Sequence, residues 1–340
     1  MPKDPLRAKE VAPAEAPATR RLRIGDGIFR SSSVAVSVGL IGLLAVMLGV
    51  LLFAAAPTFR AFGLRFISGV QWNPVTDQFG ALPYIYGTIV TSTLAIVLAL
   101  PVSLGLALLL NEVRSGWLRN PLTVLVDLLA AIPSVVYGLW GIFVMAPFLN
   151  KTLEPALGAT LGRLPLVGSL FQPTASAGNM LNAGIILAVM VIPIITAVSR
   201  EVIAIVPGDL REAALAMGAT RYEAIKMAVL PYARNGIVGA TMLGLGRALG
   251  ETIAVAMLIG NGLGISASLL APGYTIPAVI ANEFREATSV GLHRSALLAL
   301  AVLLVLIALF LAAASRMLVR NTAERFAVRP SEVSMTMETP

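Results

Sequence analysis

Hydrophobic residues occur along this chain in six long runs, separated by polar intervals of very different length. The runs fall at about residues 34–56, 84–110, 121–149, 181–206, 234–260 and 295–317. An α-helix rises about 1.5 Å per residue, so roughly 20 apolar residues cross the ~30 Å hydrocarbon layer of a membrane. Each run is long enough, and the pattern therefore predicts an all-α membrane protein with six transmembrane helices.

Composition agrees with this fold class and excludes several kinds of functional site. Apolar residues make up 57% of the chain and charged residues 13%. The chain has no cysteine, which excludes disulfides, thiol catalysis and cysteine metal sites. Its single histidine, His293, cannot build a metal cluster by itself, and we expect it to be a solvated loop residue. No Walker A sequence is present, so we predict neither a nucleotide site nor a catalytic constellation.

The basic residues are distributed as the positive-inside rule describes. They gather in an N-terminal tail (1–33), around Arg114 and Arg119, in the interval 200–234, and toward a C-terminal tail (318–340). Six crossings put both ends of the chain on the same side, and the rule places that side in the cytoplasm. This distribution accounts for the net charge of +7 without nucleic acid. The N-terminal tail is rich in Pro, Ala and charge, and we expect it to be disordered.

The polar interval 207–233 predicts two short helices joined by a sharp turn. Asp209 with Glu212, and Thr220 with Glu223, have the spacing of capping boxes at helix starts. Gly218 suits the left-handed position just after a helix end. A rigid helix-turn-helix on a membrane face is suited to contact with a partner in the water.

The same interval resembles the EAA loop of ABC importer permeases, written E-A-A-x3-G-x9-I-x-L-P. Ala228 stands where the family usually has Ile, which removes one apolar contact. The resemblance implies that 207–233 docks into a groove on a cytoplasmic ATPase; the alternative is an ordinary amphipathic connector. The residues that carry the match are Glu212, Ala213, Ala214, Gly218, Leu230 and Pro231.

The fifth apolar run contains the pair of charges most unusual for a membrane. If this helix enters the membrane near Ile237, Arg247 lies about 15 Å deep, close to the midplane. Glu251 follows four residues later on the same helix face, so the two side chains can pair. A charge at this depth usually faces a cavity and serves function, and a guanidinium matches phosphate oxygens two at a time. A buried ion pair that fixes the helix register is the alternative.

The third apolar run offers further candidates. Pro133 predicts a kink there, and Ser134 and Tyr137 place two hydroxyls beside it. These residues either line a substrate pathway or form a packing bend. Asp127 is the other intramembrane acid, and it would pair with a basic group of a partner subunit or cap a gate.

Three segments, R-A-L-G-E-T, I-P-S-V-V-Y-G and A-N-E-F, resemble the permeases of phosphate-specific ABC importers. The resemblance covers about residues 84–317 and favours the PstC-like subunit, with the helix at 34–56 as an extra N-terminal element. It implies ATP-driven import of inorganic phosphate across a bacterial inner membrane. The implied partners are a second, PstA-like permease, a PstB-like ATPase dimer and a periplasmic PstS-like phosphate-binding protein. ATP and magnesium would be used by the ATPase, and this chain would hold no cofactor and no metal.

Other functions compatible with the sequence stay open. The EAA loop does not separate phosphate from sulfate, molybdate or amino-acid permeases, so only the helix with Arg247 and Glu251 bears on the cargo. An anion channel or secondary transporter would favour inverted repeats or paired broken helices, which the sequence does not display. A membrane sensor of phosphate could use the same scaffold.

Overall fold

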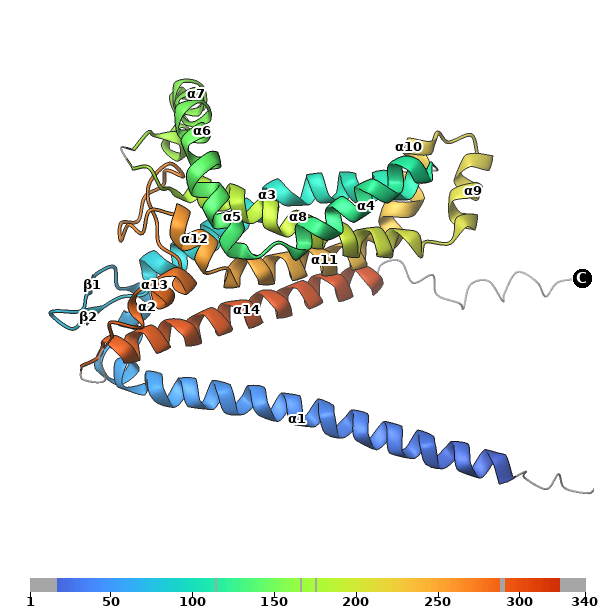
Figure 1. Ribbon diagram of the computed structural model, residues 1–340, viewed down its shortest axis with the longest axis horizontal. Coiled ribbons are helices and arrows are strands. Elements are labelled where there is room, and N and C mark those ends of the chain that lie inside the picture. Colours follow the sequence, from blue (N-terminus) through green and yellow to red (C-terminus); the bar gives the residue numbers. More distant parts are fainter. Residues whose placement is uncertain (1–16, 114, 166, 175, 288–290, 325–340) are drawn as a thin grey trace, which may run out of the picture. The chain divides into compact units, whose positions relative to one another are not determined.

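The computed structural model describes residues 17–324 except 114, 166, 175 and 288–290, and the side chains of residues 29–317 with the same exceptions. Helices make up most of it (Figure 1). The chain divides into two units, which we consider separately: one ends at Phe53 and the other begins at Ala54.

Helix α1 (Pro17–Phe62) provides the first unit and enters the second. The sequence predicts a disordered tail up to residue 33, but the helix begins at Pro17, so residues 17–33 are helical. Proline suits a first turn because it lacks an N–H that a helix start leaves unpaired. Residues 1–16 lie outside the described residues. At the other end, α14 (His293–Glu324) continues into the predicted C-terminal tail, of which 325–340 are not described.

Four described helices are long and apolar enough to cross a membrane: Phe29–Phe62 within α1, α3 (Leu82–Glu112), α8 (Met180–Ala204) and His293–Met317 within α14. A bent helix pair that begins with α4 (Gly116–Ala131) raises the number to five. These confirm a mostly helical, multi-pass membrane fold. The count of six crossings and the cytoplasmic placement of both ends stay predictions.

The predicted third helix, 121–149, is not one helix. It consists of the end of α4 and a second arm that begins with α5 (Ser134–Trp140), with a bend of 95° between them. Pro133 disfavours helical geometry in the residue before it, and Ile132 is accordingly extended, with ψ of 129°. The Tyr137 hydroxyl donates a hydrogen bond of 2.8 Å to the Leu129 carbonyl. The usual donor to this carbonyl, four residues later, would be Pro133, which has no N–H, and the Ile132 N–H reaches the same oxygen over a longer 3.4 Å. The kink expected at Pro133 is therefore a complete corner.

The predicted fifth helix, 234–260, is also interrupted. Helix α11 (Leu230–Gly250) ends before Glu251, whose backbone is extended with ψ of 127°. The chain resumes as α12 (Ile253–Leu258). Glycine is a poor helix former and is common at helix ends, so Gly250 is a natural stopping point.

Two wide helical turns precede prolines that lie inside longer helices. The π-helix η1 (Gly141–Met145) comes just before Pro147 in α6 (Ala146–Lys151), and η4 (Ile225–Val229) comes just before Pro231 in α11. A proline ring collides with the carbonyl four residues earlier in an α-helix. A π-turn moves that carbonyl away, so the helix passes the proline without breaking.

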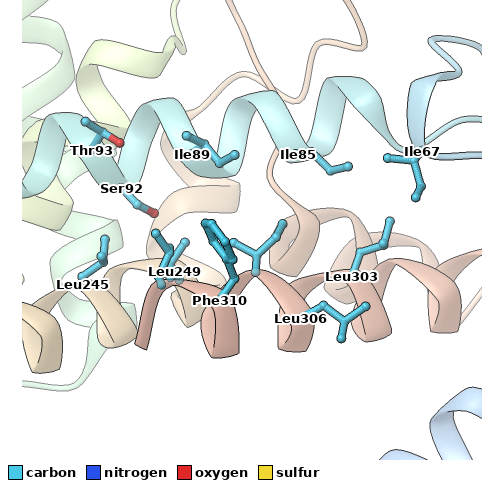
Figure 2. Close-up of a pocket in the computed structure, with 12 residues that line it drawn as sticks. Ile67, Ile85, Ile89, Ser92, Thr93, Leu245, Leu249, Leu303, Leu306 and Phe310 are labelled. Atoms are coloured by element: carbon cyan, nitrogen blue, oxygen red, sulfur yellow. The ribbon is translucent and has the colours of Figure 1, made fainter. Parts of the chain in front are cut away.

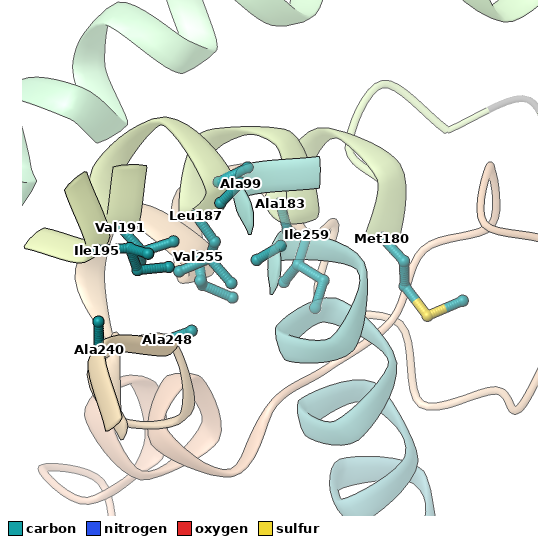
Figure 3. Close-up of a cluster of buried hydrophobic side chains, with 12 residues drawn as sticks. Ala99, Met180, Ala183, Leu187, Val191, Ile195, Ala240, Ala248, Val255 and Ile259 are labelled. Atoms are coloured by element: carbon teal, nitrogen blue, oxygen red, sulfur yellow. The ribbon is translucent and has the colours of Figure 1, made fainter. Parts of the chain in front are cut away.

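The core of the second unit lies where α3, α8, α11 and α12 meet (Figure 3). Much of it is built from small residues: Ala95 and Ala99 of α3, Ala183 of α8, and Ala240 and Ala248 of α11. Small side chains let helix backbones approach closely, which is the usual way that membrane helices associate.

Short elements gather at the end of the unit where α3, α8 and α14 begin, whereas α9 and α10 lie at the opposite end (Figure 1). The short elements are α2 (Arg65–Ser68), the antiparallel hairpin of β1 (Trp72–Asn73) and β2 (Gln78–Phe79), α7 (Leu153–Thr160), the 3-10 turns η2 (Leu161–Arg163) and η3 (Gly168–Phe171), and α13 (Ile276–Glu283).

His293 was expected to be a solvated loop residue, and its surroundings in the structure show otherwise. This residue begins α14 and is largely buried, with its Nε2 atom 2.9 Å from Glu283 Oε2. Trp72 Nε1 donates to the same carboxylate oxygen over 2.9 Å, and the Phe79 ring stacks on the imidazole. His293 thus joins the hairpin to the junction of α13 and α14 and is not a solvated loop residue.

The segment between α12 and α13 crosses α3 at Gly87, where backbone packs directly against backbone. A Cβ atom at position 87 would lie 2.2 Å from the Tyr274 carbonyl oxygen. We expect Gly87→Ala to lower the free energy of unfolding by about 1–3 kcal/mol, because the crossing segment must move outward. Thermal unfolding in detergent checks this. Gly105→Ala, on the same helix with open space around its Cβ, is the matched control and should keep at least wild-type stability. Equal melting temperatures for both variants would contradict the prediction.

Candidate substrate site and coupling surface

Arg247 lies in the last turn of α11 and is exposed on the surface of this single chain. Its neighbour Ala248 is buried in the core, so the guanidinium leaves the helix on another side. The predicted midplane arginine therefore faces away from the core of its own chain. A desolvated charge in that position needs either a water-filled path or a partner subunit beside it.

Helix α5 brings Tyr137 to the same region. It packs closely on α12 at Gly138, where a Cβ would lie 2.7 Å from Met257 Sδ and 3.1 Å from Ala254 Cα. Arg247 is close enough to Tyr137 for its charge to act on the phenol. Two of the candidate site residues, from predicted helices three and five, are thus brought together.

Tyr137 and Ser134 differ in how accessible they are. Tyr137 is 6% exposed and its hydroxyl hydrogen is used in the bond to Leu129. Only the lone pairs of that oxygen are left for another group. The bond from Tyr137 to Leu129 therefore stabilises the corner between α4 and α5. Ser134 begins α5 and is half-buried.

Glu251 does not pair with Arg247. The predicted ion pair assumed one continuous helix, but α11 ends at Gly250 and Glu251 stands on extended backbone, half-buried. The two side chains form no ion pair, because the break removes the four-residue geometry that would have aligned them. Asp127 lies in the second half of α4, exposed, beside the buried Val126.

The interval 207–233 contains the two predicted helices, α9 (Gly208–Ala216) and α10 (Arg221–Ala224). Gly218 has φ of +86°, the left-handed conformation that glycine adopts without strain. Its N–H donates to the Leu215 carbonyl over 3.0 Å, and the Ala219 N–H donates to the Ala214 carbonyl over 3.2 Å. These two bonds form a complete Schellman motif, so the turn predicted at Gly218 is confirmed.

One capping box is confirmed and the other is wrong. Thr220 and Glu223 cap each other's backbone at the start of α10, with the Thr220 N–H donating to Glu223 Oε2 over 2.8 Å. At α9, however, Pro207 is the capping residue and no side chain accepts a bond. The helix starts two residues earlier than the Asp209–Glu212 spacing requires, and Asp209 falls in the first turn, where its charge still favours the helix dipole.

The cap at Thr220 predicts a pH effect. Bonds from the Thr220 N–H and hydroxyl lower the pKa of Glu223 below its ordinary value. The ionised carboxylate therefore stabilises the fold above the unfolded-state pKa, and this contribution disappears as the pH falls through the lowered folded-state pKa. We expect Glu223→Gln to melt at a lower temperature than wild type near neutral pH and at the same temperature in strong acid. Melting curves across pH check this, with Glu212→Gln, which disturbs no cap, as the control. A difference that persists in acid would contradict the assignment.

Glu112, which no sequence motif singles out, ties this loop to the membrane helices. Its Oε1 lies 2.8 Å from Arg211 Nη2 of α9. Next to it, the Asn111 amide donates to the Arg200 carbonyl at the end of α8 over 3.1 Å. The signal that could have found it was the Asn-Glu pair that ends the second apolar run. Both contacts surround a cavity of about 150 Å³ that also reaches Leu215 and Arg221.

The outer surface of the loop carries large exposed side chains, notably Met217 (80% exposed) and Tyr222 (71%). Of the loop residues predicted for coupling, Glu212, Ala213 and Gly218 are exposed, Pro231 is exposed at the start of α11, Leu230 is half-buried and Ala214 is buried. This surface is apolar and aromatic, and it stands on a rigid turn that an ion pair fixes to α3. It is therefore suited to transmit movement between a soluble partner and the membrane helices.

Comparison with known proteins relates this architecture to transport systems. A family model described as "Binding-protein-dependent transport system inner membrane component" matches residues 99–324. The "Phosphate transport system permease protein PstC" of Xylella fastidiosa is 46% identical over 275 residues, which cover 81% of this chain and 84% of that protein. The protein of the same name from Mesorhizobium japonicum is 44% identical over 309 residues, covering 89% of this chain and 93% of its own.

Among solved structures, a chain of the MetNI methionine ABC transporter in an inward-facing conformation aligns with a TM-score of 0.52. The alignment covers 74% of this chain and 99% of that chain, at 19% sequence identity. At this identity the similarity shows a shared fold and nothing about cargo.

Proposed function

The chain belongs to the family of binding-protein-dependent transport system inner membrane components, and on this premise we propose that it is a permease subunit of an ATP-driven importer of inorganic phosphate. It is a multi-pass protein of the inner membrane. The observation that carries the phosphate assignment is that its curated relatives, matched over 81–89% of this chain, are phosphate transport permeases of the PstC type.

The proposed substrate site is centred on Arg247. Its planar guanidinium can donate two parallel hydrogen bonds to phosphate oxygens, and it lies at the surface of this chain, where a second permease subunit would complete the pathway. Tyr137 is proposed to hold the corner between α4 and α5, close enough to Arg247 to feel its charge, and Ser134 to offer a hydroxyl on the same helix. Because Glu251 stands free of Arg247, it is proposed to accept a hydrogen bond from a protonated phosphate oxygen.

The remaining parts of the assembly follow from the same premise. A PstA-like second permease, a PstB-like ATPase dimer and a PstS-like binding protein are the proposed partners. ATP and magnesium are proposed to be bound and used only by the ATPase, and this chain is proposed to hold no cofactor. Asp127, exposed on α4, is proposed to meet a basic group of the second permease.

Uptake of radiolabelled phosphate by membrane vesicles that carry the assembled complex tests the function. ATP-dependent phosphate uptake, unaffected by an excess of unlabelled sulfate, is the expected result. Sulfate uptake would keep the importer and overturn its cargo. Phosphate uptake that continues without ATP would overturn the importer and favour a channel.

A further inference from the structure

One half of the loop 207–233 is continuous with the helix that carries Arg247. Helix α10, the π-turn η4 and helix α11 follow one another without a break from Arg221 to Gly250. At the rise of an α-helix this rod is about 45 Å long. Its lower part is held in the core, because Val229 and Ala233 are buried in a cluster with residues of α3 and α8. Movement of α10 therefore passes directly along α11 toward Arg247.

Helix α9, the other half of the loop, is held differently. Ala214 alone of its nine residues is buried, and a helix this short is marginal by itself in water. It packs on η4 and α10, and the Glu112–Arg211 ion pair joins it to the last turn of α3. Protein atoms cover Glu112 Oε1, while 29% of the Glu112 side chain and 35% of the Arg211 side chain stay exposed. A covered carboxylate is costly unless a cation lies beside it, so the pair fixes α9 against α3.

The residue before Glu112 fixes the same end of α3 to α8. Asn111 Nδ2 donates to the Ala107 carbonyl of its own helix over 2.9 Å and to the Arg200 carbonyl of α8 over 3.1 Å. Two consecutive residues thus connect α3, α8 and α9 at one place. Closely packed helices transmit displacement, and α3 packs along α8, so a displacement of α9 that reaches Glu112 moves both.

Toward its other end, α3 faces the turn of α11 that carries Arg247. There Ile89 and Ser92 of α3 lie opposite Leu245 and Leu249 of α11 across an apolar pocket of about 440 Å³ (Figure 2). The pocket leaves space between the two helices, so α3 can shift relative to α11 at this end, whereas at the loop both helices are fixed to the same short segment. A displacement of α3 at the loop would therefore change the space beside the turn with Arg247.

We propose that Glu112 is a positioning residue for coupling: its ion pair with Arg211 fixes α9 to α3, so that movement of the ATPase against the loop reaches α3 and α8 as well as α11. The inference rests on the proposed function. Glu112 touches neither phosphate nor ATP in this role and acts through Arg211. Without the pair, movement applied to α9 would displace α9 alone, and only the rod of α10 and α11 would respond.

ATP hydrolysis by the assembled complex, with and without the phosphate-loaded binding protein, tests the proposal. Glu112→Gln keeps the shape of the side chain and removes its charge. It should lower the ratio of stimulated to basal rate about two- to fivefold, the effect expected from loss of a partly exposed ion pair. Glu112→Arg places two cations together and should lower the ratio further. The swapped variant Glu112→Arg, Arg211→Glu should restore most of the stimulation. Glu201→Gln, which changes an exposed glutamate near the end of α8, is the matched control and should behave as wild type.

Hydrogen–deuterium exchange on the purified full-length chain tests the contact without the partners. The backbone amides of α9 should exchange faster in Glu112→Gln than in wild type, and at the wild-type rate in Glu201→Gln. Unchanged exchange in α9 would overturn the proposal, because the pair would then not hold this helix.

The hydrolysis results separate this proposal from the proposed function. If the binding protein stimulates wild type and Glu112→Gln equally, Glu112 has no role in coupling and the proposal is wrong. A swapped variant as poorly stimulated as Glu112→Arg would also overturn it, since Glu112 would then not act through Arg211. If the phosphate-loaded binding protein does not stimulate the wild-type complex, the proposed function itself is overturned, and this role of Glu112 with it.

Discussion

Replacing Arg247 with alanine is expected to abolish phosphate uptake while the protein still inserts and assembles. The guanidinium is the group proposed to hold phosphate, and each hydrogen bond to a charged partner contributes about 1.5–3 kcal/mol, so the loss of two lowers the transport rate by about 100-fold or more. Assembly is expected to survive because the change removes a charge from the membrane, and such a charge costs at least about 2.5–3.5 kcal/mol to insert. Uptake by vesicles that contain equal amounts of complex measures the effect.

Two further variants make this result specific. Arg247→Lys keeps the charge but not the planar fork of donors, so partial uptake is expected. Arg316→Ala removes an exposed arginine from α14 and should leave uptake close to the wild-type rate. If Arg247→Ala is inserted, hydrolyses ATP normally and still transports phosphate at the wild-type rate, then Arg247 is a packing charge and the substrate site lies elsewhere.

The long helices could be predicted closely because hydrophobicity decides them. Runs predicted at 84–110 and 181–206 correspond to α3 (Leu82–Glu112) and α8 (Met180–Ala204). The membrane leaves no other way to satisfy the backbone of a long apolar segment. The sequence also determined the turn at Gly218, because only a few residues tolerate a positive φ.

The breaks in helices three and five could not be predicted from periodicity. Apolar residues continue through Pro133 and through Gly250, so the pattern indicates one helix in each case. Whether a proline bends a membrane helix or ends it depends on which group donates a hydrogen bond to the carbonyl that loses its usual N–H partner. Here the Tyr137 hydroxyl donates to the Leu129 carbonyl. The Arg247–Glu251 pair failed for the same reason, since it depended on a helix that stops between the two residues.

Contacts between distant segments account for the other errors. His293 lies within bonding distance of Glu283 and stacks on Phe79. The sequence around position 293 gives no sign that it will pack against a hairpin more than two hundred residues earlier. The Glu112–Arg211 ion pair likewise joins the end of α3 to α9, although α4 to α8 lie between them in the sequence. Local patterns predict elements, whereas these pairs exist only once the elements are packed.

Changing Gly218 to proline is expected to uncouple ATP hydrolysis from transport. Proline fixes φ near −65°, whereas Gly218 has φ of +86°, and proline also lacks the N–H that bonds to Leu215. The Schellman turn cannot form, so α9 and α10 lose the fixed angle that presents Met217 and Tyr222 to the proposed ATPase. Substrate-stimulated hydrolysis should fall to the basal rate, and phosphate uptake should fall with it.

Graded variants separate loss of the turn from loss of the surface. Gly218→Ala retains the N–H and carries a strain of about 1–2 kcal/mol, so its coupling should be intermediate. Gly208→Ala, in the first turn of α9 with open space around its Cβ, is the matched control and should couple normally. Glu212→Lys leaves the turn intact and reverses an exposed charge on α9, so it should uncouple through the docking surface alone. Normal stimulation of hydrolysis in both Gly218→Pro and Glu212→Lys would mean that the ATPase contacts the permease at another place, because neither the shape nor the charge of this loop would then affect it.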